Sequence, residues 1–144
     1  MKKIVLIVLL LVSGSTYSQN STLRVVGNLN AVPSQLSLVE LQSVFMGTKP
    51  KWNNTDKVVL AMMNLNTVGG KATCDKIYKM TPDAVKKYWL ALSFKGTVKA
   101  PVFFNTADEV VSFVSKNRGA IGIIDVPKTV TGTKAVLINN KPTF

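Results

Sequence analysis

The residues best suited to bind a ligand lie together in residues 64–73, which read NLNTVGGKAT. An apolar run precedes them and a helical pattern follows, so the segment predicts a strand, a loop and the start of a helix. Glycines allow backbone N–H groups to come close to a ligand, and a helix N-terminus presents unpaired donors with a partial positive charge. The stretch therefore predicts a small-anion site, with five candidate contacts: Thr67, Gly69, Gly70, Lys71 and Thr73.

Lys71 supplies the only full charge of that segment. In the first helical turn a cation opposes the helix dipole, which suggests a role other than helix stability. The alternative is an ordinary helix cap with one solvated lysine. The stretch is not a P-loop, because Leu65 stands where that motif needs its first glycine.

Catalytic chemistry has few candidates in this chain. It contains no histidine and seven carboxylates, so the commonest general base and the histidine-based metal sites are excluded. Glu40 and Glu109 are explained by capping boxes. Asp75 and Asp83 fall in first helical turns, where negative charge is favourable. We therefore expect no enzymatic activity, no metal and no cofactor.

The N-terminal residues indicate export. Two lysines precede an apolar run over residues 4–12 and a small polar stretch over residues 13–18, which is the pattern of a cleaved signal peptide. The run is too short to span a bilayer. A short signal anchor is the alternative. We expect a signal peptide over residues 1–18 and a mature, soluble, periplasmic or secreted domain over residues 19–144.

Charge and cysteine usage narrow the class of partner. The net charge is +11 with Lys and Arg scattered along the chain, so an anion or an acidic surface would be attracted. The basic residues form no stripe with aromatics, which argues against nucleic acid. Cys74 is the only cysteine; we expect a small apolar filler on a helix rather than a reactive thiol.

Hydrophobic periodicity and capping residues predict an α/β order of elements. The capping pairs are Ser37 with Glu40 and Thr106 with Glu109, and Thr81-Pro82 is a third helix start. A fully apolar run such as residues 58–63 suits a strand covered on both faces. We expect strands at residues 23–26, 58–63, 121–124 and 135–138, helices at 38–45, 72–79, 82–92 and 107–116, a loop at 48–56 and an extended link at 96–101.

The aromatic residues have a ligand-stacking and a core interpretation. At helical or loop-anchor spacing, Trp52, Trp89 and Phe94 are more typical of core side chains than of a ligand site. Asn53-Asn54-Thr55 matches a glycosylation sequon, but we interpret it as a turn.

Several short motifs occur in an order that resembles the phosphate ABC transporter substrate-binding proteins, a family with the type II periplasmic-binding-protein fold. The motifs are Phe45-Met46-Gly47, Trp52, Tyr88-Trp89, Phe94-Lys95-Gly96 and Gly119-Ala120-Ile121-Gly122. The resemblance covers about residues 38–125. It implies a single lobe of that fold, with a mixed sheet of about four or five strands and helices on both faces.

Two departures from the family pattern limit what the resemblance implies. The family has two lobes, and this chain has length for one. The family's ligand loop also carries an arginine before Ser-Gly-Thr, whereas residues 68–73 read VGGKAT, so the arginine fork that suits phosphate is missing.

These departures leave three hypotheses. The first is an exported, non-enzymatic solute-binding-like protein that holds phosphate or another small anion weakly, with an ABC transporter as a partner. The second is an envelope interaction module that has lost ligand binding. The third is a dimer in which a second chain completes the missing lobe.

Overall fold

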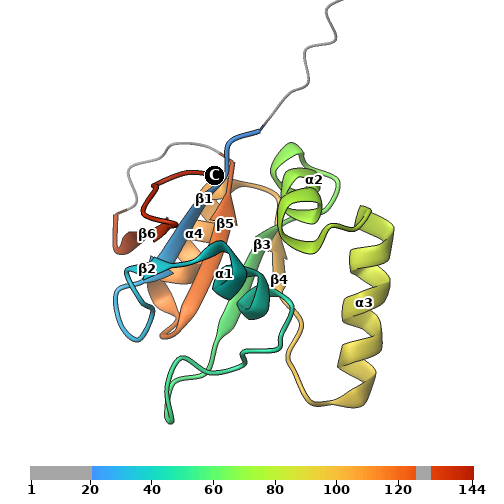
Figure 1. The fold of residues 1–144 in the computed structure, drawn as a ribbon, viewed down its shortest axis with the longest axis horizontal. Coiled ribbons are helices and arrows are strands. Elements are labelled where there is room, and N and C mark those ends of the chain that lie inside the picture. The colour runs from blue at the N-terminus through green and yellow to red at the C-terminus, as the bar shows by residue number, and fades with distance from the viewer. Residues whose placement is uncertain (1–20, 126–130) are drawn as a thin grey trace, which may run out of the picture.

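A computed structural model describes residues 21–125 and 131–144 of the chain. The expected signal peptide lies outside the described residues. A six-stranded mixed sheet forms the centre, in the order β2-β6-β1-β5-β3-β4 (Figure 1). The strands are β1 (Arg24–Asn28), β2 (Gln35–Leu36), β3 (Val59–Met63), β4 (Val102–Phe104), β5 (Ala120–Ile124) and β6 (Thr133–Ile138).

Both faces of the sheet are covered by helices, as expected. One face packs against α1 (Leu38–Phe45), the π-helical segment η1 (Cys74–Tyr78) and α3 (Pro82–Lys95), and the other against α4 (Ala107–Lys116). The short helix α2 (Val68–Thr73) runs directly into η1. In Figure 1, α3 stands to one side of the sheet. The α/β fold predicted from the sequence is therefore confirmed.

The direction of the strands separates the sheet into two parts. Strand β3 runs parallel to β4 on one side and to β5 on the other. Strand β1 is antiparallel to both β5 and β6. The three parallel strands β3, β4 and β5 therefore end at the same edge of the sheet.

The predicted helix starts are present. The Glu40 N–H donates to Ser37 Oγ at 3.1 Å, and the Glu40 carboxylate accepts from the Ser37 N–H at 2.8 Å. Thr106 and Glu109 form the second capping box in the same way. Thr81 caps α3, with proline in its first turn.

Two sequence-based expectations about local structure need correction, and two strands were not expected. The helix expected at residues 72–79 begins at Val68, because Thr67 supplies an N-cap. The unexpected strands are β4, which follows the link at residues 96–101, and the two-residue strand β2, which pairs with β6. Neither strand contains an apolar run long enough to be predicted. Phe94 is 84% exposed rather than in the core, since it lies on the outer face of α3.

The other predicted core residues lie as expected. Trp89 is buried, and Trp52 packs against the same core cluster. Cys74 is buried, and this burial raises the pKa of its thiol to about 11, which fits the filler interpretation. Within the described ranges no helix has the length and hydropathy to cross a membrane.

Candidate functional site

The parallel strands β3, β4 and β5 each end in a polar residue at the same edge of the sheet. Asn64 follows β3, Asn105 follows β4 and Asp125 follows β5. The Asn64 side-chain amide donates to Asn105 Oδ1 at 3.2 Å, which joins two of these strand ends. In open α/β sheets ligands bind outside the carboxyl ends of the strands. This edge of the sheet, where α2 also begins, is therefore the candidate site (Figure 1).

Thr67 organises the turn that leads from β3 into α2. Its hydroxyl donates to the Asn64 carbonyl at 2.6 Å and accepts from the Gly70 N–H at 3.0 Å. The Lys71 N–H donates to the Thr67 carbonyl at 2.9 Å. The first-turn amides of Val68 and Gly69 cannot have intrahelical acceptors, so they are the donors that a ligand at this helix start would meet.

The two glycines of the segment fit tightly against neighbouring chain. A Cβ at Gly70 would lie 2.0 Å from the Asn64 carbonyl oxygen. A Cβ at Gly69 would lie 2.9 Å from Cβ and Cγ of Asp125. Glycine at both positions therefore allows α2 to pack directly on the β3 turn and on the end of β5.

Lys71 and Thr73 have opposite surroundings. Lys71 is exposed, in the fourth helical position rather than the first turn, because α2 begins at Val68. Thr73 is completely buried, and its hydroxyl donates to the Gly69 carbonyl at 2.8 Å. The structure thus brings Thr67, Gly69 and Gly70 together around one turn, with Lys71 outside and Thr73 beneath.

Asp125 is a residue of the candidate site that the sequence did not predict. Its carboxylate lies beside Gly69, with Oδ2 only 3.0 Å from the position that a Cβ on that glycine would take. A carboxylate at the start of a helix is electrostatically favourable for the helix, but it repels a bound anion. The sequence could have indicated Asp125, since this residue directly follows a predicted strand and ligands bind near the carboxyl ends of strands in such sheets.

A second group of polar residues adjoins the same edge. A pocket of about 340 Å³ lies between the β3 turn, the start of α3 and β4. It is lined by Asn64, Leu65, Asn66, Pro82, Asp83, Lys86, Trp89 and Phe103. Its amides, one ammonium group and one carboxylate provide polar contacts next to the Thr67 turn. In the part of the chain that the structure describes, no group of three or more His, Cys, Asp or Glu could hold a metal ion.

Comparison with known proteins gives a fold but no family. No protein-family model matches the chain, and no curated protein matches it. A phosphate transport receptor from Vibrio cholerae matches with TM-score 0.66 at 14% identity, over 87% of this chain and 50% of that one. PstS from Borrelia burgdorferi matches with TM-score 0.62 at 12% identity, over 85% and 52% of the chains.

A third solved structure gives the same result. It is a putative phosphate ABC transporter substrate-binding protein from Clostridium perfringens with bound phosphate, and it matches with TM-score 0.61 at 15% identity. The match covers 85% of this chain and 47% of that one. The chain thus spans about half the length of the three solved proteins that it matches. It shares their fold at low sequence identity.

Proposed function

We propose that this chain is an exported, non-enzymatic, solute-binding-like protein that holds a small oxyanion of the phosphate class weakly. The observation that carries the proposal is that Asp125, at the end of β5, meets the first turn of α2 at Gly69, while Asn105, at the end of β4, bonds to Asn64 in the adjoining β3 turn. The fold likeness to phosphate-transport receptors supports it. In this proposal an ABC transporter is a partner, as it is for proteins of that class.

The five candidate residues have two kinds of role in the proposed site. In the proposal Gly69 contacts the anion through its backbone N–H. Lys71, which is exposed and lies outside the turn, reaches the anion through its long side chain. Thr67 and Gly70 are already hydrogen-bonded to each other and hold the turn in shape. Thr73 fixes the same turn from beneath through the Gly69 carbonyl.

Asp125 explains why binding should be weak and which anion should be preferred. Its carboxylate repels an anion beside Gly69. Phosphate near neutral pH retains a proton that can be donated to this carboxylate, whereas sulfate has none. With few donors and an open site, we expect a phosphate dissociation constant on the order of 1 mM and weaker binding of sulfate.

Calorimetry with phosphate and sulfate tests the proposed site. Lys71→Ala should weaken phosphate binding about two- to five-fold, the effect of one exposed charge, while Lys87→Ala on α3 should leave it unchanged. Asp125→Asn should reduce the preference for phosphate over sulfate, because a neutral amide, unlike the carboxylate, can lie beside an anion that carries no proton. The absence of heat at several millimolar of either anion would refute the anion site.

A second candidate is an envelope interaction module, and the outer face of α3 favours it. Leu90 is 58% exposed and Phe94 is 84% exposed, and they lie one helical turn apart on the same face. Co-purification from an envelope extract should yield a stoichiometric partner that Leu90→Ser with Phe94→Ser loses. Light scattering would show instead whether a second copy of the chain completes the missing lobe.

A further inference from the structure

A different pocket lies at the opposite end of β3 from the Thr67 turn. Its volume is about 420 Å³, and the residues that line it include Val58, Val59 and Leu60 from the start of that strand. The other walls come from the end of α1, from the loop after it and from the link between α3 and β4. Figure 1 shows this loop and this link at the same end of the molecule, away from α2. We call it the lysine-rimmed pocket.

The lysine-rimmed pocket combines an apolar floor with a cationic rim. Its apolar lining includes Val44, Pro50, Val58, Leu60 and Val98. Its charged lining residues are all lysines, namely Lys49, Lys51, Lys57 and Lys99, and no carboxylate lines it. Small-molecule pockets have this general composition, with mostly apolar walls and a few charged groups, and this volume.

Two of the lysines face each other in an arrangement that is unfavourable without a counter-ion. Lys51 and Lys57 are directly paired in an antiparallel bridge. Like charges directly opposite each other on neighbouring strands destabilise the pairing. Both lysines line the pocket, so an anion bound there would relieve this repulsion.

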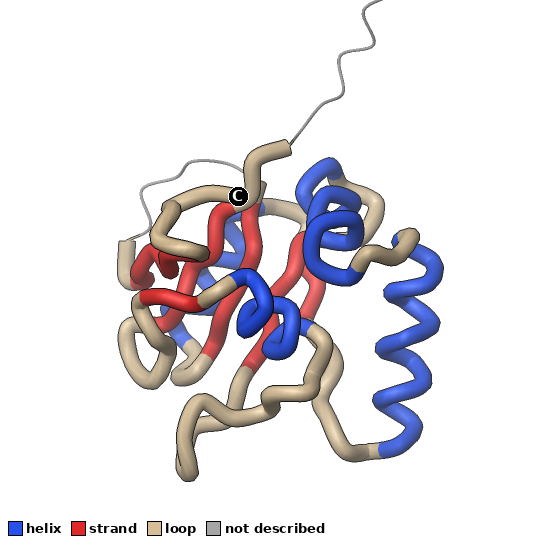
Figure 2. The backbone as a smooth tube through the Cα atoms, viewed as in Figure 1, coloured by secondary structure: helices blue, strands red, loops and turns tan. Residues whose placement is uncertain are grey.

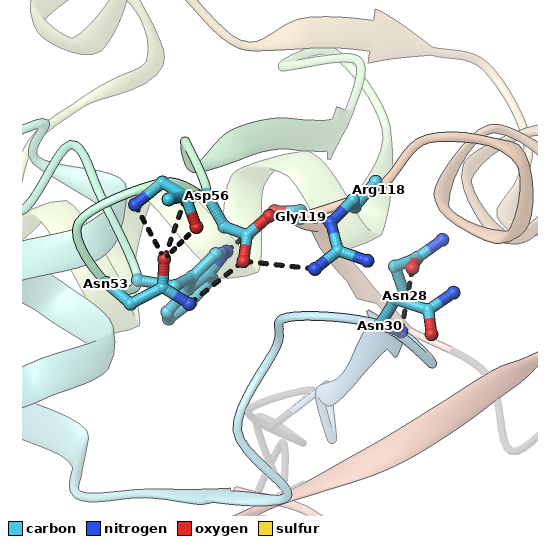
Figure 3. Close-up of polar contacts among 8 residues, drawn as sticks. Asn28, Asn30, Asn53, Asp56, Arg118 and Gly119 are labelled. Carbon is cyan, nitrogen blue, oxygen red and sulfur yellow. Dashed lines mark hydrogen bonds and ion pairs between the residues drawn. The ribbon is translucent and has the colours of Figure 1, made fainter.

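The acid closest in sequence is engaged elsewhere. Asp56 is the only acidic residue between positions 50 and 58. Its carboxylate accepts from Arg118 Nε at 2.6 Å and from the Asn53 side-chain amide at 2.9 Å (Figure 3). The ion pair with Arg118 neutralises Asp56 and leaves the two bridged lysines without a partner from their own hairpin.

The hairpin that carries these lysines is held firmly in place. The Val58 N–H donates to the Pro50 carbonyl, and the Trp52 N–H donates to the Asp56 carbonyl, both at 2.9 Å. The Trp52 indole donates to the Gly119 carbonyl at 2.8 Å, which attaches the hairpin to the start of β5. A backbone that is already ordered loses little conformational entropy when the side chains it carries bind a ligand. Figure 2 shows that this whole segment is loop, so these contacts rather than regular structure fix it.

We propose that the lysine-rimmed pocket binds a small amphipathic anion, an aliphatic carboxylate of medium chain length. The carboxylate head meets Lys51 and Lys57, and the aliphatic chain lies on Val44, Leu60 and Val98. The proposal uses no residue of the oxyanion site. The two sites lie at opposite ends of β3, whose five residues span about 16 Å. Either site can therefore fail without the other.

Calorimetry with hexanoate, octanoate and decanoate tests the chemistry of the ligand. Each added methylene that is buried should tighten binding about four-fold until the floor is filled. Octylamine, with the same tail and the opposite charge, should not bind. Equal affinities along the series, or equal binding of octylamine, would overturn the proposal.

Two sets of variants test the location. Lys51→Gln with Lys57→Gln should weaken octanoate binding about five-fold or more, whereas Lys87→Gln with Lys134→Gln makes the same change in net charge and should have no effect. Val98→Phe narrows the floor and should shift the preference to a shorter chain, with circular dichroism as the check on folding. Equal weakening by both lysine pairs would show a general charge effect and contradict the site.

A vesicle assay separates a dissolved amphiphile from a lipid surface. We expect monomeric octanoate to bind below its micellar concentration. We also expect that any preference of the protein for phosphatidylglycerol vesicles over phosphatidylcholine vesicles does not depend on Lys51 and Lys57. Vesicle binding that requires these lysines, without binding of monomeric octanoate, would assign the rim to membrane contact and refute the pocket.

Discussion

The backbone carbonyl of Asn64 occupies the space that a side chain at Gly70 would need, 2.0 Å from the position of a Cβ. This contact joins the end of β3 to the first turn of α2. The Thr67 hydroxyl bonds to both residues, since it donates to the Asn64 carbonyl and accepts from the Gly70 N–H. The turn at the candidate oxyanion site is therefore specified by close packing as well as by hydrogen bonds.

Gly70→Ala should destabilise the fold. The backbone of the turn must move to admit the methyl group, and overpacking of this kind costs about 1–3 kcal/mol or more. Urea denaturation measures the loss. Gly96→Ala is the matched control: nothing lies within 4 Å of its Cβ position, but its φ is +66°, so it should lose only about 1 kcal/mol from backbone strain. An equal loss in both variants would contradict the packing argument.

Tyr78→Phe should destabilise more than Tyr88→Phe. The Tyr78 hydroxyl donates to the Phe45 carbonyl at 2.7 Å and accepts from the Trp89 indole N–H at 3.0 Å, all within the core. Its removal leaves two buried groups unpaired, at a cost of about 1–3 kcal/mol for such a group. Tyr88 is partly exposed and donates only to the Met46 carbonyl, so water can replace it. Thermal unfolding of the two variants should show the difference.

The ion pair of Arg118 and Asp56 should make stability depend on pH in the acid range. The hydrogen bond from Arg118 is the main cause that lowers the pKa of the Asp56 carboxyl below its ordinary 3.8, and Asn53 adds to it. A lowered folded-state pKa means stability that is fully present above the unfolded pKa and is lost as pH falls through the folded one. Arg118→Gln should therefore reduce the pH dependence of stability below about pH 4.

Urea unfolding at a series of pH values compares the wild type with Arg118→Gln. The two curves should differ near neutral pH and converge at low pH, where Asp56 is protonated in both proteins. A constant difference at all pH values would assign the effect of Arg118 to packing rather than to its charge.

Cys74 should be inert in the folded protein. Burial raises the pKa of the thiol to about 11, so the thiolate needed for nucleophilic attack is rare at pH 8. Reaction with a disulfide reagent should be slow in buffer and fast in denaturing urea. Rapid modification of the native protein would contradict burial of the thiol and support the reactive-cysteine interpretation.

The sequence was sufficient to predict the elements whose signals come from residues close together in the chain. The capping boxes of Ser37 and Thr106 and the apolar runs of β3 and β5 depend on neighbouring residues alone. Strands β2 and β4 were missed because they are short edge strands whose existence depends on distant partners. Phe94 was misplaced because helical spacing indicates a face but not whether anything covers it.

The candidate site was only partly predictable for the same reason. The residues around Thr67 form one continuous segment, so the turn could be proposed from its glycines and hydroxyls. Asp125 reaches that turn from the end of another strand, and Asn105 from a third. The pairing of Lys51 with Lys57 in the lysine-rimmed pocket could not be predicted, because it depends on the register of the hairpin.

The position of β1 has a consequence for how the chain folds. This strand is the first described along the chain and lies in the middle of the sheet, where it pairs with β5 and β6, about a hundred residues later. During synthesis it must wait for almost all of the remaining described chain before either neighbour exists. Such distant pairing slows folding and leaves an apolar strand uncovered in the nascent polypeptide. The time between the synthesis of β1 and its pairing with β5 and β6 is thus long, and Val25 and Val26 stay accessible to a holding chaperone during that time.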